Sequence, residues 1–197
     1  MYYKTNIHEA IVFSIQTHEV HQNQKRKGTG VSYITHPLTV GMILARTGAS
    51  DDVVTAGILH DTIEDSTPEH KVTESMLSAL FGEGVARLVA SLSEEDKRLP
   101  WTERKAAALV KVQTFSHEQL LVKSADIVSN ASDLIESYQC EGDAIFTHFN
   151  ASKAEMLIHQ RTLIRTILAC WPETPLSKDL KEIDVALGEI EVGTFRT

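Results

Sequence analysis

The stretch DDVVTAGILHDTIED at residues 51–65 decides the fold of this chain. Ser50 is a good N-cap, and the two aspartates after it suit the positive N-terminal end of a helix. Residues 53–59 are apolar on most sides of that helix, which is typical of a buried central helix. Its C-terminal end carries four polar side chains: His60, Asp61, Glu64 and Asp65. Buried charge is costly unless it is paired or bound to a metal, so this end of the helix is predicted to hold a functional cluster.

Helical periodicity continues on both sides of this stretch, with apolar residues recurring at i, i+3 and i+4. Ser116 is the N-cap of the helix that carries Asp126. The predicted helices cover residues 6–22, 37–48, 51–65, 72–81, 84–93, 102–115, 116 to beyond 126, 143–170 and a last segment with its apolar stripe at Leu180, Ile183, Leu187 and Ile190. No strand pattern interrupts them. We therefore expect an all-α fold, a single helical bundle over residues 1–171 with a C-terminal helical appendage over 172–197.

Composition narrows the class of protein. The 197 residues are 42% hydrophobic and 23% charged, with a formal net charge of −8. That acidic balance argues against a nucleic-acid binder, which needs a basic footprint to neutralise phosphates, but it leaves room for a small anionic substrate in one local pocket. No apolar run has the length of a membrane span, and Cys140 and Cys170 lie in no metal or redox spacing. We expect a cytoplasmic protein with no membrane partner.

Four residues are candidate metal ligands: His36, His60, Asp61 and Asp126. Two neutral imidazoles and two carboxylates make a mixed nitrogen and oxygen donor set, which suits a divalent first-row metal such as Mn²⁺. Each residue alone also has a structural interpretation. His36, beside Pro37, fits a cap or core position, and Asp126 with Asn130 fits an exposed polar face at a spacing of four residues.

A second acidic pair, Glu64 and Asp65, follows His60 and Asp61 by one helical turn. Carboxylates at that position would overhang the proposed ion, within reach of a proton on an attacking water. The alternative is a fraying helix end before Pro68. Acidic side chains interact unfavourably with the dipole at a helix C-terminus. A fraying helix end would give no compensating interaction for placing two carboxylates there. One metal cluster and one acid/base pair on a single helix indicate a hydrolase.

Two basic pairs are candidates for substrate binding. Arg26 and Lys27 lie on a glycine-containing loop about ten residues before His36. A guanidinium there could stack on a base or grip a phosphate, with an ammonium beside it. Lys105, which follows Arg104, is the second candidate. For both pairs, solvated surface charge is the alternative interpretation.

The order H…HD…D is the metal signature of the HD phosphohydrolase superfamily, and the match extends to the hydrolase domain of the RelA/SpoT alarmone enzymes. The resemblance runs roughly from Asn6 to Leu134. It is carried by HQNQKRK at 21–27, YITHP at 33–37, AGILHDTIEDS at 56–66, FG at 81–82 with Val85 and Val89, and VKSAD at 122–126 with Asn130 and Asp133. The chain is most similar to the stand-alone small alarmone hydrolases of Mesh type, so we expect no nucleotide-synthesising domain.

The resemblance implies a Mn²⁺-dependent enzyme, with one ion per chain, that removes the 3′-pyrophosphate from guanosine tetra- or pentaphosphate, (p)ppGpp. It implies that His36, His60, Asp61 and Asp126 are the ligands and that Glu64 and Asp65 handle the water. It also implies that Arg26, Lys27 and Asn130 contact the nucleotide. Phe149 takes the position of a family tyrosine, without the hydroxyl.

Two rival functions stay open. The first is an HD phosphatase that acts on another phosphorylated nucleotide, such as the 2′-phosphate of NADPH. The second is an alarmone-binding sensor without turnover. The apolar stripe of the last helix could dock on the chain's own bundle, which is our expectation, or on a second subunit, so a monomer and a homodimer both remain possible.

Overall fold

The structure, a computed structural model, describes residues 5–93 and 99–195 and is all-α over those ranges, as the sequence predicted. An isolated antiparallel bridge between Lys25 and Ser32 is the one β-type pairing among the described residues. These residues divide into two compact units, 5–26 with 30–93 and 27–29 with 99–195. The predicted division into 1–171 and 172–197 stays a prediction, since compactness alone does not show which segments fold independently.

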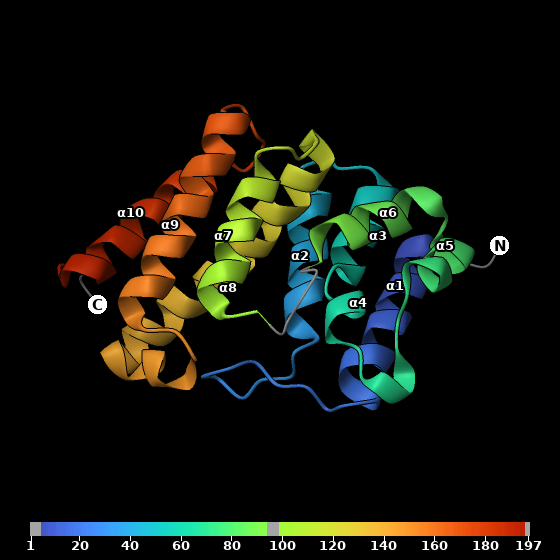
Figure 1. Cartoon of the computed structure of the whole chain (residues 1–197), viewed down its shortest axis with the longest axis horizontal. Helices are drawn as coiled ribbons and strands as arrows, with labels where there is room; N and C mark the ends of the chain where they lie inside the picture. The colour runs from blue at the N-terminus through green and yellow to red at the C-terminus, as the bar shows by residue number, and fades with distance from the viewer. Residues whose placement is uncertain (1–4, 94–98, 196–197) are drawn as a thin grey trace. The chain divides into compact units, whose positions relative to one another are not determined.

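The first unit consists of six α-helices and two short helical turns (Figure 1). The helices are α1 (Asn6–Ile15), α2 (Thr35–Arg46), α3 (Asp51–Leu59), α4 (Thr62–Asp65), α5 (Glu74–Phe81) and α6 (Glu83–Leu92). A π-helical turn, Gln16–Val20, continues α1, and a 3₁₀ turn, Pro68–His70, precedes α5. The first helix begins at Asn6, and the side chain of Thr5 caps it.

Helix α3 is the core of the first unit. It packs against α1, α2 and α6, and every residue from Val53 to Leu59 is buried. Ser50 caps it by accepting a hydrogen bond from the Val53 amide, as the sequence predicted. A helix that is apolar on all sides needs neighbours on all sides, and the fold supplies them.

Two glycines let α2 and α3 approach closely. A Cβ atom at Gly41 would lie 2.6 Å from Cγ1 of Ile58, and one at Gly57 would lie 2.2 Å from Cδ1 of Leu44. Both separations are far below van der Waals contact, so neither position has room for a larger residue in this packing. The close approach sets the distance between the start of α2 and the end of α3.

The prediction of one helix over 51–65 is wrong in one respect, because the helix is interrupted at His60 and Asp61. The Thr62 hydroxyl donates to the Leu59 carbonyl, and the His60 ring bonds the Gly57 carbonyl. These two side chains bond the main-chain carbonyls of Gly57 and Leu59 where the regular main-chain hydrogen bonds of the helix stop. The chain then resumes as α4, with the Asp65 amide donating to the Asp61 carbonyl.

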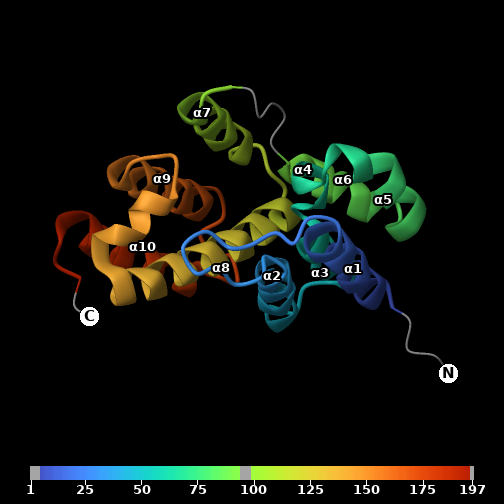
Figure 2. The same cartoon turned by 90° about the horizontal axis from the view of Figure 1, so that it is seen from below.

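The second unit is built around α8 (His117–Glu141), a long helix seen in Figure 2. It begins with a capping box formed by Ser116 and Gln119. The predicted helix over 143–170 is in fact two elements, a 3₁₀ helix (Gly142–His148) and α9 (Lys153–Cys170). Ser152 and Glu155 form a second capping box, which starts α9 ten residues later than predicted. The remaining helices are α7 (Trp101–Val112) and α10 (Ser177–Val192).

Helix α10 packs on α8 and α9, so the last helix covers its own chain as expected. The predicted stripe, Leu180, Ile183, Leu187 and Ile190, is buried. Arg161 on α9 bonds Asp184 and Glu191 on α10, and Arg165 also reaches Asp184. The hydrogen bond that Arg161 donates to Asp184 is the main reason that the pKa of Arg161 lies above its ordinary value. These ion pairs line the polar edge of the apolar contact.

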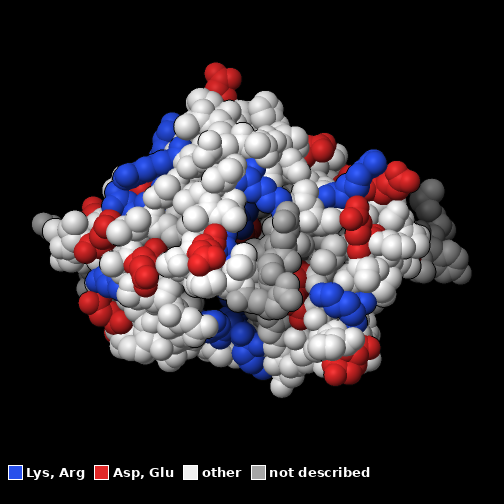
Figure 3. All heavy atoms as spheres, viewed as in Figure 1, with Lys and Arg blue, Asp and Glu red and all other residues white. Residues whose placement is uncertain are grey.

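Lys and Arg side chains are interspersed with Asp and Glu over the face in Figure 3. Within residues 5–93 and 99–195, no helix combines the length and the apolar character that crossing a membrane requires.

The packing at Gly57 leads to a stability prediction. We expect Gly57→Ala to lower the free energy of unfolding by about 1–3 kcal/mol, because its Cβ would overlap Leu44 and press on Val40 Cγ1 at 3.3 Å. This loss should occur although alanine favours a helix by about 1 kcal/mol over glycine. The matched control is Gly84→Ala on α6, where an added Cβ meets nothing within 4 Å. We expect no loss there in urea unfolding; equal losses in both variants would contradict the packing explanation.

Candidate metal centre and its surroundings

His36 lies in the first turn of α2, where the main chain turns out of the loop. Its side chain is buried, and the edge of its ring faces Tyr33, with ring centroids 5.7 Å apart. Pro37 follows it within the same turn, a position where its missing N–H costs no helical hydrogen bond. The local sequence therefore points a histidine from the start of α2 into the interior of the first unit.

His60 ends α3, and one hydrogen bond defines its ring orientation. Nδ1 lies 2.8 Å from the Gly57 carbonyl oxygen. A carbonyl only accepts, so Nδ1 carries the proton and a neutral ring keeps its lone pair on Nε2. This arrangement, a histidine held through one nitrogen by a main-chain carbonyl, is typical of metal ligands.

Three donor atoms converge in the first unit. His36 Nε2 and His60 Nε2 lie 3.3 Å apart, and Asp61 Oδ2 lies 3.0 Å from His60 Nε2 and 3.6 Å from His36 Nε2. Bonds of about 2.1 Å to one ion place neighbouring ligand atoms about 3.0–3.4 Å apart. The separations of 3.3 and 3.0 Å lie within that range, and the third, 3.6 Å, is slightly longer. His36, His60 and Asp126 are all buried and each offers a donor atom suited to a metal ion. The residues present fit a divalent ion.

Tyr33 supports Asp61 from the loop before α2. Its hydroxyl donates to Asp61 Oδ2, the same oxygen that faces the two imidazoles. On the Tyr33 ring lies the Arg26 guanidinium, 5.7 Å from the ring centroid. The predicted substrate residue Arg26 and the predicted ligand Asp61 are therefore both in contact with Tyr33.

Asp65 is held by a different set of contacts. Gln24 Nε2 donates to Asp65 Oδ2 at 3.0 Å, and Gln22 Nε2 donates to the Asp65 carbonyl at 2.9 Å. Gln24 Oε1 in turn lies 2.7 Å from Nδ1 of His18. Glu64 and Asp65 are both partly buried, at the end of α4. Residues 16–24 thus orient the carboxylate that the sequence assigned to proton transfer.

In the second unit, Asp126 is a buried carboxylate on α8. Lys123 Nζ donates to its Oδ2 at 2.8 Å, and Asn130 Nδ2 donates to its Oδ1 at 2.5 Å. The partners are three residues before it and four after it, so one helix face carries all three. Asn130, predicted to contact the substrate, therefore also orients a predicted metal ligand.

The other predicted substrate residues lie in the second unit. Lys27 Nζ is 6.0 Å from the centroid of the Phe149 ring, so these two residues are in contact. The neighbouring Gly28 lies close to the 3₁₀ helix, since a Cβ there would lie 2.5 Å from Ile145 Cδ1. Lys105 is half-buried on α7.

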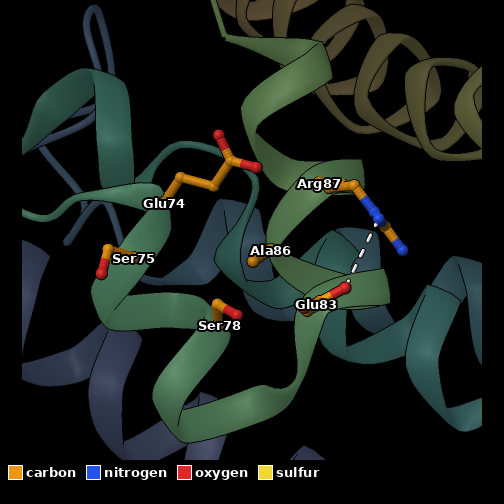
Figure 4. Close-up of a pocket in the computed structure, with 6 residues that line it drawn as sticks. All are labelled: Glu74, Ser75, Ser78, Glu83, Ala86 and Arg87. Atoms are coloured by element: carbon orange, nitrogen blue, oxygen red, sulfur yellow. Dashed lines mark ion pairs between the residues drawn. The ribbon is translucent and has the colours of Figure 1, made fainter.

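A pocket of about 440 Å³ lies between α5 and α6 (Figure 4). Its lining is Glu74, Ser75, Ser78, Glu83, Ala86 and Arg87. Glu83 and Arg87 form an exposed ion pair at 3.5 Å. None of the predicted site residues lines this pocket.

Sequence reasoning missed Gln24 and His18 as parts of the site. His18 lies in a segment that was treated as a helix face, and Gln24 stands within the HQNQKRK motif at 21–27 but was given no role. The available signal was His18 itself, because a histidine in line with the apolar residues of the first helix needs a partner. Tyr33 was quoted within a motif but given no role, and its hydrogen bond to Asp61 supplies one.

Comparison with known proteins places this geometry in context. A model of the HD domain family matches residues 10–157. The chain is similar to a protein of Danio rerio named guanosine-3′,5′-bis(diphosphate) 3′-pyrophosphohydrolase MESH1. The two are 40% identical over 119 residues, which cover 59% of this chain and 63% of that protein. The chain spans less than two thirds of the length of the curated animal relatives that it matches.

Two solved structures share the fold. One is described as a metazoan ortholog of SpoT that hydrolyses ppGpp and plays a role in starvation responses. It matches with a TM-score of 0.73 and 22% identity, over 93% of this chain and 96% of that one. The other, from Listeria monocytogenes EGD-e, has a TM-score of 0.70 and 30% identity, and the match covers 80% of this chain and 99% of that one.

The burial of His18 leads to a prediction of pH dependence. Desolvation lowers the pKa of its ring, and this outweighs the hydrogen bond to Gln24 and the attraction of Asp61 and Asp65, which raise it. An unfolded chain titrates this ring near about 6.5, so below that pH the unfolded state binds more protons than the folded state. The stability contribution is therefore complete above about pH 6.5 and is lost as the pH falls through the folded pKa.

We expect the free energy of unfolding to fall more steeply from about pH 7.5 to about pH 5.5 in the unsubstituted protein than in His18→Leu. Urea unfolding in the presence of chelator measures both. Parallel pH profiles would show that His18 does not titrate in this way.

Proposed function

We propose a function from one premise: this chain belongs to the HD domain family. The proposed reaction is hydrolysis of the 3′-pyrophosphate of (p)ppGpp. Water attacks the phosphorus that carries the 3′ oxygen, the bond from phosphorus to that oxygen breaks, and pyrophosphate leaves with guanosine di- or triphosphate as the other product. The relative from Danio rerio carries the name of this activity.

One observation supports the proposal above all others, the convergence of His36 Nε2, His60 Nε2 and Asp61 Oδ2 within 3.6 Å of one another. The His60 lone pair points at the other two donors because its Nδ1 is engaged by Gly57. Nitrogen and oxygen donors gathered in this way, largely buried, favour a bound cation over a vacant polar cluster.

The proposed cofactor is one Mn²⁺ ion per chain, with His36, His60, Asp61 and Asp126 as its ligands. A bound divalent ion polarises a phosphoryl oxygen and lowers the pKa of a coordinated water. Two neutral imidazoles with two carboxylates give a mixed nitrogen and oxygen set that suits Mn²⁺. Asp126 supports the proposal as a buried carboxylate with both oxygens oriented, by Lys123 and by Asn130.

Glu64 and Asp65 are the proposed acid/base residues. A carboxylate that accepts the proton of the attacking water must be held in one orientation to act efficiently. Gln24 holds Asp65 Oδ2 from one side, which restricts the orientation of this carboxylate. Glu64, one residue earlier on α4, is the second proton carrier in this proposal.

The proposed nucleotide contacts are Arg26, Lys27, Lys105, Asn130 and Phe149. Arg26 lies over an aromatic ring and so presents a flat, charged face on which a base can stack. Lys27 adds an ammonium for phosphate next to the Phe149 ring. These groups select a small polyanionic nucleotide, and a cytoplasmic location follows from that substrate.

The first prediction is metal-dependent turnover. We expect purified protein with Mn²⁺ to release guanosine diphosphate and pyrophosphate from ppGpp, and chelator to abolish release. Asp126→Asn should lose both tightly bound Mn²⁺ and activity, because it removes a charged ligand. Glu136→Gln, an exposed substitution on the same helix, is the matched control and should keep both.

Metal-loaded protein without turnover of ppGpp would contradict the proposed substrate. Release of phosphate from NADPH would then support the rival phosphatase, and tight ppGpp binding without product would support the sensor. Asp126→Asn that retains stoichiometric Mn²⁺ would remove Asp126 from the ligand set.

The second prediction separates proton transfer from metal binding. We expect Glu64→Gln and Asp65→Asn to lower kcat by about 10²–10⁴-fold, the usual contribution of a positioned acid or base. Both variants should still bind Mn²⁺, since neither residue is a proposed ligand. Glu69→Gln, exposed on the next helical turn, should retain full activity. Full activity in either acidic variant would reject its role.

A further inference from the structure

His18 occupies an unusual place for a titratable group. It lies in the π-helical turn after α1 and is fully buried, with 0% of its surface exposed. Its Nδ1 bonds Gln24 Oε1 at 2.7 Å. Its Nε2 has no hydrogen-bond partner among the residues that the structure describes.

Stability alone does not account for this histidine. A buried ring nitrogen without a partner is costly, and an apolar side chain of similar size would avoid that cost. Desolvation also holds the ring in its neutral form, since it lowers the pKa of His18. What the histidine supplies, and an apolar residue would not, is one N–H group at Nδ1.

The direction of each hydrogen bond follows from the chemistry of Asp65. An ionised carboxylate only accepts, so the Gln24 amide must turn its NH₂ group toward Asp65 Oδ2, 3.0 Å away. The Gln24 oxygen then faces His18, whose Nδ1 donates the second bond. Both hydrogen bonds therefore run in the same direction: His18 donates to Gln24, and Gln24 donates to Asp65. Without the Nδ1 proton, Asp65 alone would hold the Gln24 amide, and the Gln24 oxygen would lose its partner at His18.

His18 also packs against Tyr33, with ring centroids 5.0 Å apart. The Tyr33 hydroxyl donates to Asp61, a proposed metal ligand. One buried ring thus lies behind two carboxylates of the proposed site, through Gln24 on one side and Tyr33 on the other.

We infer that His18 is a positioning residue that fixes the Gln24 amide and, through it, the Asp65 carboxylate that faces the attacking water. The catalytic consequence rests on the proposed function, whereas the positioning does not. His18 touches neither substrate nor metal in this role.

A set of substitutions tests the chain of bonds. His18→Leu removes the donor, His18→Asn keeps an N–H near the position of Nδ1, and Gln24→Leu removes the link. We expect His18→Leu and Gln24→Leu each to lower kcat for ppGpp about tenfold or more through misorientation, with KM and Mn²⁺ affinity little changed. His18→Asn should recover most of the loss. Ser14→Ala, which removes another buried polar atom one turn earlier, is the matched control and should keep full kcat.

The double variant gives the sharpest readout. If His18 acts through Gln24, adding His18→Leu to Gln24→Leu should cost nothing further. Multiplied losses would overturn the inference, because they would mean that His18 acts by a separate route, such as general packing. If His18→Leu does not fold, His18→Gln replaces it, since it carries its amide near the position of Nε2 and should not rescue activity.

A measurement without substrate separates the two proposals. In the metal-free protein, the side-chain amide of Gln24 should give one pair of NMR signals, identified by their absence in Gln24→Leu, at chemical shifts that differ from those of a free glutamine amide, and His18→Leu should move them toward the free values. An amide that stays fixed in His18→Leu overturns the inference whatever the activity. A His18-dependent amide in a protein without ppGpp turnover supports the positioning and rejects the proposed reaction.

Discussion

The close approach of α2 and α3 is the constraint on which the candidate site depends. The two helices run in opposite directions, so the start of α2 meets the end of α3. Gly41 and Gly57 remove the side chains that would hold them apart. His36 and His60, 24 residues apart in sequence, therefore place their Nε2 atoms 3.3 Å from each other. Gly57 acts twice, since its missing Cβ admits Leu44 and its carbonyl orients the His60 ring.

The sequence predicted the parts of the fold that follow from strong local patterns. A stretch that is apolar on all sides, capped by Ser50, can only be a buried helix, and α3 is one. The interruption at His60 and Asp61 could not be predicted in this way, because it depends on side chains that compete for main-chain carbonyls. Thr62 and His60 both do so. When the main-chain hydrogen bonds of a helix are interrupted for one or two residues and then resume, the spacing of the apolar residues does not change. Apolar periodicity therefore does not reveal the interruption.

The same limit explains what was predicted of the site. The ligand candidates were found because histidines and carboxylates at the end of a buried helix are individually unusual. The residues behind them are not unusual in that way. Gln24 lies in a polar loop, and His18 follows the apolar spacing of the first helix, so only the fold brings them to Asp65. Hydrogen-bond partners far apart in sequence have no local signature.

Charge explains why the proposed ligand set needs all four members. Neutral His36 and His60 carry no charge, and Asp61 carries one negative charge. These three ligands would therefore neutralise only half of the charge of a divalent ion. A second carboxylate makes the sum neutral, and Asp126 is the buried carboxylate of α8 available for it. Lys123 and Asn130 donate hydrogen bonds to the two carboxylate oxygens of Asp126. In the proposed site, the Lys123 ammonium would compete with the metal for the same carboxylate, so the ion would have to gain more from the two imidazoles than it loses to the lysine. Two neutral nitrogen ligands would provide that preference, because an ammonium has no vacant orbital for a lone pair and a transition-metal ion does.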